Sequence, residues 1–267
     1  MTRLLHPRFV RANRYHPDWV LARGAGGANA LWLTEWLAES LGLRAGMRVL
    51  DRGCGKAASS VFLRREFGVE VWAADLWFDA EQNRACAEDA GVGDGVHAVH
   101  ADARALPFEP GFFDAIVSID SYQYYGTDDL YTHCIARLLA PGGVLAIAGA
   151  GLTREFEGEV PAALQDWWEP SLCCLHSAAW WQQHWRRSGA LDVLCSDTLP
   201  DAWQLWLQWQ REIAPDNQAE IDALVRDAGA WLTYVRTIAR RREGVQLDPL
   251  PTSIATRYQR MPLLRDG

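Results

Sequence analysis

The segment over residues 49–60 constrains the fold more than any other part of the chain. A short apolar run ends in Asp51, turns through Gly53 and Gly55, and continues as a helix-compatible segment over residues 57–67. Glycine suits such a turn because it adopts positive φ and lets the backbone approach a ligand closely. The helix that follows would offer free N–H groups and a partial positive charge. The pattern predicts a strand, a ligand-binding turn and a helix, the opening unit of an α/β fold.

Acidic residues end three successive strand-like runs. These are Asp51, Asp75, which lies 24 residues further on, and Asp102. The carboxyl ends of parallel strands meet at one edge of a sheet, and ligands of open α/β sheets bind there. An acid roughly 20 residues after the glycine turn is where a nucleotide-type ligand has its ribose hydroxyls held. A glycine turn alone is equally typical of a purely structural connection, so the interpretation depends on the spacing of the acids.

Five motifs follow one another in order between residues 45 and 150: Val49-Leu50-Asp51-Arg52-Gly53-Cys54-Gly55, then Asp75, then Ala101-Asp102-Ala103 with Leu106-Pro107-Phe108, then Phe113-Asp114-Ala115-Ile116-Val117-Ser118, then Leu138-Leu139-Ala140-Pro141-Gly142-Gly143. This order resembles the class I S-adenosylmethionine-dependent methyltransferases, in the small-molecule branch that includes the quinone-biosynthesis methyltransferases. The resemblance implies a Rossmann-like α/β fold with a mostly parallel seven-stranded sheet and helices on both faces. Two positions depart from the family: Ala57 replaces its usual third glycine, and Arg52 replaces an aliphatic residue.

The resemblance also implies the cofactor site. Asp75 is expected to hold the ribose, Trp77 to stack on the adenine, and Asp102 to accept a hydrogen bond from the exocyclic amine. The implied cofactor-binding residues are Asp51, Gly53, Cys54, Gly55, Asp75, Leu76, Trp77, Asp102, Ala103 and Asp120. The cofactor that the resemblance implies is S-adenosylmethionine, with S-adenosylhomocysteine as its product, and no metal is expected.

The segment after the fourth strand-like run is where we expect the chemistry, because in the family it faces both the sulfonium methyl and the acceptor. Asp120 and Tyr122 are candidate catalytic residues, although Asp120 could instead hold the methionine ammonium group. His176 is a further candidate base, with plain packing as the alternative. The expected acceptor contacts are Tyr122, Tyr124, Tyr125, Trp180 and Trp181.

The chain is expected to divide into four segments. These are an N-terminal cap and helix over residues 1–44, a cofactor-binding core over 45–199, a helical lid over 200–248 and a last strand with the tail over 249–267. The lid is predicted from apolar residues at helical intervals between Asn217 and Arg242. The last strand is predicted from a β-like run over residues 252–258. A separate helical interaction domain is the alternative to the lid.

The N-terminal cap is expected to cover the cofactor. Residues 29–41 place apolar side chains on one face and predict an amphipathic helix. By the resemblance alone, Tyr15, Trp19 and Asn29 are candidates to touch the cofactor, and plain packing of the cap is the alternative.

Composition excludes several partners. Acids outnumber bases 34 to 26, for a net charge of −8, so nucleic acid is a poor partner. No apolar run approaches the length of a membrane span, and the N-terminal residues lack the apolar core of a secretory signal. The six cysteines form no C-x-x-C pair and no zinc spacing, which favours reduced thiols in a cytoplasmic protein. The fourteen tryptophans fit a packed core or an aromatic wall beside an active site.

The leading hypothesis is therefore an enzyme that transfers a methyl group to a small molecule by in-line SN2 displacement. An amine or an aromatic, natural-product-like acceptor is favoured. One alternative is a nicotinamide-dependent oxidoreductase, against which stands the Asp51-x-Gly53-x-Gly55 form instead of Gly-x-Gly-x-x-Gly. Another is a non-catalytic cofactor-binding partner protein whose helical segment is an interface.

Overall fold

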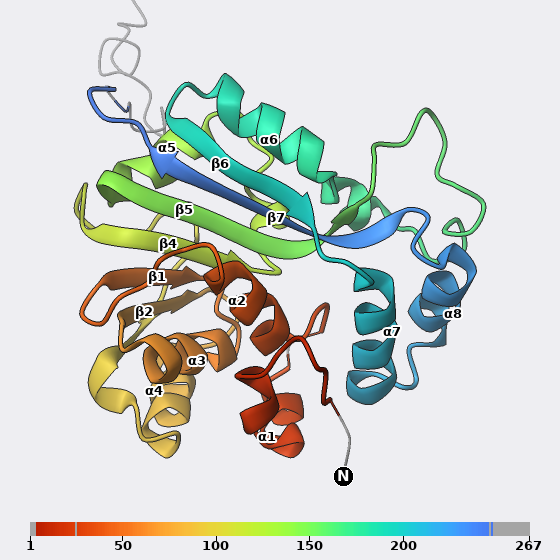
Figure 1. Ribbon diagram of the computed structural model, residues 1–267, viewed down its shortest axis with the longest axis horizontal. Coiled ribbons are helices and arrows are strands. Elements are labelled where there is room, and N and C mark those ends of the chain that lie inside the picture. Colours follow the sequence, from red (N-terminus) through yellow and green to blue (C-terminus); the bar gives the residue numbers. More distant parts are fainter. Residues whose placement is uncertain (1–3, 25, 246, 248–267) are drawn as a thin grey trace, which may run out of the picture.

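The computed structural model describes residues 4–24, 26–245 and 247. Its centre is a seven-stranded sheet in the order β3-β2-β1-β4-β5-β7-β6 (Figure 1). Strands β1 to β5 run parallel to one another, and β7 runs antiparallel to both β5 and β6. The strands are β1 Arg48–Arg52, β2 Glu70–Asp75, β3 Val96–His100, β4 Phe113–Ile119, β5 Leu139–Leu152, β6 Leu191–Thr198 and β7 Leu232–Arg241. The expected Rossmann-like α/β fold is confirmed.

Helices cover both faces of the sheet. In Figure 1, α2, α3 and α4 lie on one face, and α5 and α6 lie on the other. Each face has its own apolar core, and the larger one also includes side chains of α7 and α8. The helices are α1 Pro17–Ala22, α2 Ala30–Ala38, α3 Ala58–Phe67, α4 Ala80–Asp89, α5 Tyr131–Leu138, α6 Ala178–Arg187, α7 Ala202–Ile213 and α8 Gln218–Asp227.

Polar side chains start several of these helices where the sequence predicts. Asp79 accepts a hydrogen bond from the Gln82 backbone N–H and caps α4, and Ser177 does the same for α6. Asn29 caps α2 by accepting from two backbone N–H groups. These contacts satisfy donors that a helix leaves free at its first turn.

The expected helix over residues 217–242 is wrong beyond Asp227. Ala228 and Gly229 adopt positive φ and end α8, and the chain continues as β7 in the middle of the sheet. Eight consecutive residues of β7 from Leu232 are buried, so the strand lacks the alternation of a half-exposed strand. A continuous run of buried residues also contains apolar residues three and four positions apart. This spacing fits a helix as well as a strand, which explains the wrong prediction.

The expected lid over residues 200–248 is correspondingly shorter. The helices of that segment are α7 and α8, between the end of β6 and the start of β7, and their role as a lid over the acceptor stays a prediction. Trp206 of α7 stacks on Tyr234 of β7 with 5.3 Å between ring centroids, so this helix pair packs directly on the sheet. The last strand expected over residues 252–258, and the whole tail over 249–267, lie outside the described residues.

The N-terminal segment is tied to the body at several points. Glu35 of α2 accepts hydrogen bonds from the Arg11 and Ala12 backbone N–H groups at 3.0 and 2.8 Å. Arg236 of β7 donates to the Trp36 carbonyl of α2 at 2.7 Å and pairs with Asp197 of β6. Within the described ranges, no helix is long and apolar enough to cross a membrane.

Candidate functional site

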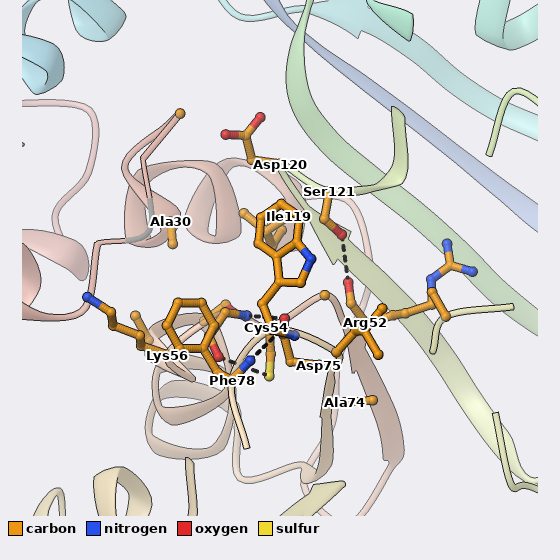
Figure 2. Close-up of a pocket in the computed structure, with 18 of the residues that line it drawn as sticks. Ala30, Arg52, Cys54, Lys56, Ala74, Asp75, Phe78, Ile119, Asp120 and Ser121 are labelled. Atoms are coloured by element: carbon orange, nitrogen blue, oxygen red, sulfur yellow. Dashed lines mark hydrogen bonds between the residues drawn. The ribbon is translucent and has the colours of Figure 1, made fainter. Parts of the chain in front are cut away.

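A cavity of about 340 Å³ opens at the carboxyl ends of β1, β2, β3 and β4. Its floor is the glycine turn after β1, and its walls are the loops that follow the other three strands. Residues 20, 23, 24, 26–28, 30 and 31 and Trp209 of α7 also line it. Figure 2 shows Cys54 and Phe78 on one side and Asp120 and Ser121 on another. This is the sheet edge at which ligands of open α/β folds bind.

The glycine turn has the geometry that its sequence predicts. Gly53 has a φ of +69°, and a Cβ there would lie 2.0 Å from the Ser121 hydroxyl oxygen. Only glycine therefore fits between the turn and the loop after β4. Ala57, which replaces the family's third glycine, has a φ of +61° directly before α3. The small Ala57 side chain is fully buried there, so helix and strand still pack closely.

Asp75 fixes the turn against the loop after β2. Its carboxylate accepts a hydrogen bond from the Gly55 backbone N–H at 2.8 Å and from those of Trp77 and Phe78 at 2.8 and 3.1 Å. Asp75 lines the cavity and is 8% exposed. Its carboxylate is thus held at the cavity wall by three backbone donors, where it can also accept from a ligand hydroxyl.

Asp51 lies below the cavity and does not line it. It is fully buried, and one of its oxygens accepts hydrogen bonds from the Ser59 and Ser60 hydroxyls, each at 2.6 Å. Burial raises the pKa of this carboxyl group to about 6, although the two serine hydrogen bonds act in the opposite direction. The structure therefore places Asp51 under the turn, as a support for α3, and not beside a ligand.

The expected adenine side of the cavity combines open and covered groups. Leu76 and Trp77 are 49% and 78% exposed at the cavity, so both are free to meet a flat ligand. Asp102 is already engaged by Arg104, whose guanidinium donates at 3.0 and 2.6 Å to its two oxygens. Arg104 also holds the pKa of Asp102 below its usual value. Asp102 can accept from a ligand amine only where Arg104 leaves an oxygen lone pair open.

Asp120 bridges the cap and the sheet. One oxygen accepts from the Ala28 backbone N–H at 2.8 Å, and the other from the Ala150 N–H at 2.9 Å and the Gln123 amide at 3.3 Å. Burial raises the pKa of Asp120, while these hydrogen bonds lower it. Because both oxygens already accept hydrogen bonds, the carboxylate is arranged to attract a cation rather than to act as an unhindered base.

Four of the expected acceptor-side residues lie outside the cavity lining. Tyr122 is 2% exposed and packs edge-on against Trp181, 5.4 Å between ring centroids, and burial raises its pKa to about 12. His176 stacks on Trp180 at 3.7 Å, and its Nδ1 lies 3.0 Å from a Glu155 oxygen. These contacts correct the predicted roles of Tyr122, His176, Trp180 and Trp181, because their side chains pack on the neighbouring helix and loop.

Tyr124 and Tyr125 do line the cavity, and their contact with an acceptor stays a prediction. Sequence reasoning missed Trp209 and, within the expected N-terminal cap, did not single out residues 20, 23, 24 and 26–28, although the glycines at 24, 26 and 27 signal a close backbone approach. A Cβ on Gly27 would lie 1.9 Å from an Asp120 oxygen, which explains one of these glycines.

The other N-terminal candidates, Tyr15, Trp19 and Asn29, lie outside the lining. Tyr15 donates to Glu66 at 3.1 Å, its ring packs against Trp19, and Asn29 serves as a helix cap. Among the described residues, no cluster of three or more His, Cys, Asp or Glu side chains could hold a metal ion.

Fold and cavity define an α/β protein with a cavity at the carboxyl edge of its sheet, where open α/β folds bind nucleotide-type ligands. Residues 49–143 match the family model of the methyltransferase domain. The chain is 37% identical over 119 residues to Methyltransferase GfsG of Streptomyces halstedii, covering 43% of this chain and 42% of that protein. It is 31% identical to the ubiquinone/menaquinone biosynthesis C-methyltransferase UbiE of Vibrio cholerae, over 46% of this chain and 48% of that protein.

Solved structures share the fold over a larger part of the chain. The [4+2]-cyclase SpnF superimposes with a TM-score of 0.65 at 22% identity, over 80% of this chain and 81% of SpnF. The geranyl diphosphate C-methyltransferase of Streptomyces coelicolor, in complex with Mg²⁺, geranyl diphosphate and S-adenosyl-L-homocysteine, has a TM-score of 0.60 at 20% identity, over 78% of each chain. These matches bear out the resemblance of residues 49–143 to the class I S-adenosylmethionine-dependent methyltransferases of the small-molecule branch. The chain spans less than half the length of the curated relatives that it matches.

Proposed function

We propose that this chain is an enzyme that binds S-adenosylmethionine in the cavity and transfers its methyl group to a small-molecule acceptor. The observation that carries the proposal is the pairing of the Gly53 turn with the Asp75 carboxylate at the cavity wall, inside the matched domain. In this arrangement Asp75 accepts from the ribose hydroxyls, and the exposed Trp77 ring covers the adenine. The Asp120 carboxylate, which is close to the cap, attracts the methionine ammonium group.

The chemistry asks little of the protein beyond positioning. The sulfonium activates the methyl group, so the enzyme must hold donor and acceptor in line at roughly 3 to 3.5 Å. Tyr124, Tyr125 and Trp209 line the cavity and supply aromatic surface for the acceptor. An amine or an aromatic, natural-product-like acceptor suits this surface. We assign no general base, because the oxygens of Asp120 are already hydrogen-bonded and His176 lies outside the lining.

Two earlier alternatives are not favoured. The matched family model and the curated relatives are methyltransferases, which disfavours a nicotinamide-dependent oxidoreductase. A non-catalytic cofactor-binding protein would bind the donor without turnover. A cytoplasmic protein that acts without metal, membrane or nucleic acid remains part of our proposal.

Isothermal titration with S-adenosylhomocysteine tests the proposed donor site. We expect the wild type to bind, and Asp75→Ala to weaken binding by about 1 to 3 kcal/mol because the ribose loses its acceptor. Asp79→Ala is the matched control, since it removes a nearby helix cap that does not line the cavity. Binding of NAD instead of S-adenosylhomocysteine would overturn the proposal.

Transfer of a labelled methyl group then identifies the acceptor. The wild type is incubated with labelled S-adenosylmethionine and separate pools of small amines, phenols and carboxylic acids. Label in one pool names the acceptor class. Tight donor binding with no label in any pool would support the non-catalytic alternative.

A further inference from the structure

Arg52, the residue that departs from the family pattern, is completely buried at the end of β1, where it is also one of the residues that line the cavity. Its guanidinium forms no ion pair among the residues that the structure describes, and its Nε and Nη2 atoms have no hydrogen-bond partner. In Figure 2 the guanidinium points away from Cys54 and Phe78. A buried cation without a carboxylate is costly, so a position that most proteins of this kind fill with an aliphatic side chain needs a reason for holding one.

Three tyrosines surround this cation. The guanidinium carbon lies 4.7 Å from the ring centroid of Tyr122, 4.6 Å from Tyr125 and 5.0 Å from Tyr131. Nη1 also donates a hydrogen bond to the Tyr131 hydroxyl. Aromatic faces carry negative charge density and attract a desolvated cation strongly. The tyrosines thus replace the missing carboxylate and are themselves fixed around the guanidinium.

Tyr131 transmits this arrangement to the expected adenine side of the cavity. Its hydroxyl donates to the Ala103 carbonyl at 2.6 Å, and Ala103 lines the cavity. The Tyr131 hydroxyl therefore accepts from Arg52 and donates to the loop after β3 at the same time. A shift of the guanidinium would move or release that loop.

Tyr125 extends the contacts of the Arg52 guanidinium to the opposite wall of the cavity, the loop after β4. Its hydroxyl lies 2.6 Å from the Ser121 hydroxyl and 3.2 Å from that of Ser118. Both serines also donate to the Arg52 carbonyl, at 3.1 and 2.9 Å. Ser121 is the side chain against which Gly53 packs, so the loop after β4 is held to the glycine turn by the backbone carbonyl of Arg52. The guanidinium adds its contact with the Tyr125 ring, and only that contact is lost when the side chain is replaced.

We propose that Arg52 is a positioning residue that holds the loop after β3 and the loop after β4 at a fixed separation across the cofactor cavity, through its cage of tyrosines Tyr122, Tyr125 and Tyr131. The inference rests on the proposed function for its consequence on ligand affinity. Its structural part, the ordering of two loops, holds without any ligand.

The first test compares Arg52→Met with Arg48→Met in the ligand-free protein. Arg48 lies on the same strand and also stacks on a ring, that of Phe112 at 4.7 Å, but it does not line the cavity. We expect Arg52→Met to speed amide hydrogen exchange at least tenfold in peptides covering residues 101–106 and 120–126, with no loss of melting temperature. Arg48→Met should leave both peptides unchanged. Equal exchange in the two variants would overturn the proposal.

The second test measures the affinity for S-adenosylhomocysteine. Arg52→Met should weaken binding at least tenfold, and Arg52→Lys should recover part of this loss because its ammonium group still stacks on the rings. Tyr131→Phe keeps a ring but loses the hydroxyl, so faster exchange confined to residues 101–106 is expected. A wild type that binds no S-adenosylhomocysteine would refute the proposed function while leaving the exchange test intact.

If Arg52→Met does not fold, Arg52→Lys and Tyr131→Phe decide the question. Folded variants with wild-type exchange in both loops would mean that Arg52 has only a packing role. A Lys variant that exchanges like wild type only in residues 120–126 would support the separate connection through Tyr131.

Discussion

Two regions of the molecule are held together by different kinds of contact. In the turn region, residues 48–120, the acids bind backbone N–H groups and nearby hydroxyls at strand ends, as Asp75 and Asp51 do. In the helix-pair region, residues 199–231 with α7 and α8, polar contacts join side chains of the two helices. There, Glu220 accepts from the Trp206 indole at 2.7 Å and from the Asn217 amide at 2.9 Å.

The difference explains which region a motif can describe. Backbone donors at a strand end stay in place whatever the neighbouring side chains are, so a few acids and glycines at fixed spacing specify the turn region. Contacts between side chains depend on the partner residue and on helix packing. The sequence of the helix-pair region can therefore vary more freely, while the turn region keeps the backbone geometry at the strand ends.

The largest effect is expected from Gly53→Ala in the turn region. The added Cβ meets the Ser121 hydroxyl at 2.0 Å in a backbone of positive φ. We expect at least 100-fold weaker binding of S-adenosylhomocysteine, about 3 kcal/mol. Gly42→Ala has a similar positive φ with nothing within 4 Å, so titration of this control should give wild-type affinity. Equal affinities would mean that the turn tolerates a side chain.

Asp51→Asn tests the buried carboxylate by pH. Burial raises the pKa of Asp51 to about 6, from 3.8, so the folded protein holds the proton more tightly than the unfolded chain. The stability from Asp51 is fully present below about pH 4 and is lost as pH rises through 6, by about 3 kcal/mol. Urea unfolding at pH 4 to 7 should show this decline in the wild type but not in Asp51→Asn.

Glu220→Gln extends the same measurement to the helix-pair region. Burial also raises the pKa of Glu220, against the hydrogen bonds from Trp206 and other side chains. The sign is therefore the same, and the pH dependence removed by this variant should be smaller than that removed by Asp51→Asn. A larger change for Glu220→Gln would reverse the comparison between the two regions.

Asn217→Ala should separate stability from cofactor binding. Asn217 caps α8 by accepting from the Glu220 backbone N–H. We expect a loss of about 1 kcal/mol of unfolding free energy, or roughly 2 to 4 °C in melting temperature, with unchanged S-adenosylhomocysteine affinity. If removing this helix cap also weakens the binding of S-adenosylhomocysteine, the two regions are not independent.

The smallest effect is expected from Arg104→Ala. Removing this exposed arginine frees the Asp102 oxygens to accept from the adenine amine, and an exposed ion pair of this kind is weak. Affinity for S-adenosylhomocysteine should rise by up to about fivefold. Arg84→Ala, on the exposed side of α4, controls for the lost charge. Weaker binding by Arg104→Ala would indicate that Arg104 itself contacts the ligand.

The sequence predicted the turn region well, because Asp75, Gly53 and Asp102 lie at strand ends whose spacing follows from chain geometry. It could not predict that Arg104 covers Asp102, since an exposed arginine has many available positions. Tyr122 was misplaced for a similar reason. The short helical turn over residues 122–124 directs Tyr122 into the core and Tyr124 outward, and no spacing rule separates the two.

The position of β7 has a consequence for the order in which the protein is made. Residues 232–241 are the last strand in the sequence among those described, yet they lie between β5 and β6. Until they leave the ribosome, β5 has an unpaired edge, β6 has no neighbour in the sheet, and α2 lacks its bond from Arg236. A nascent chain that stalls before residue 232 therefore exposes the open β5 edge as a site for aggregation or chaperone binding.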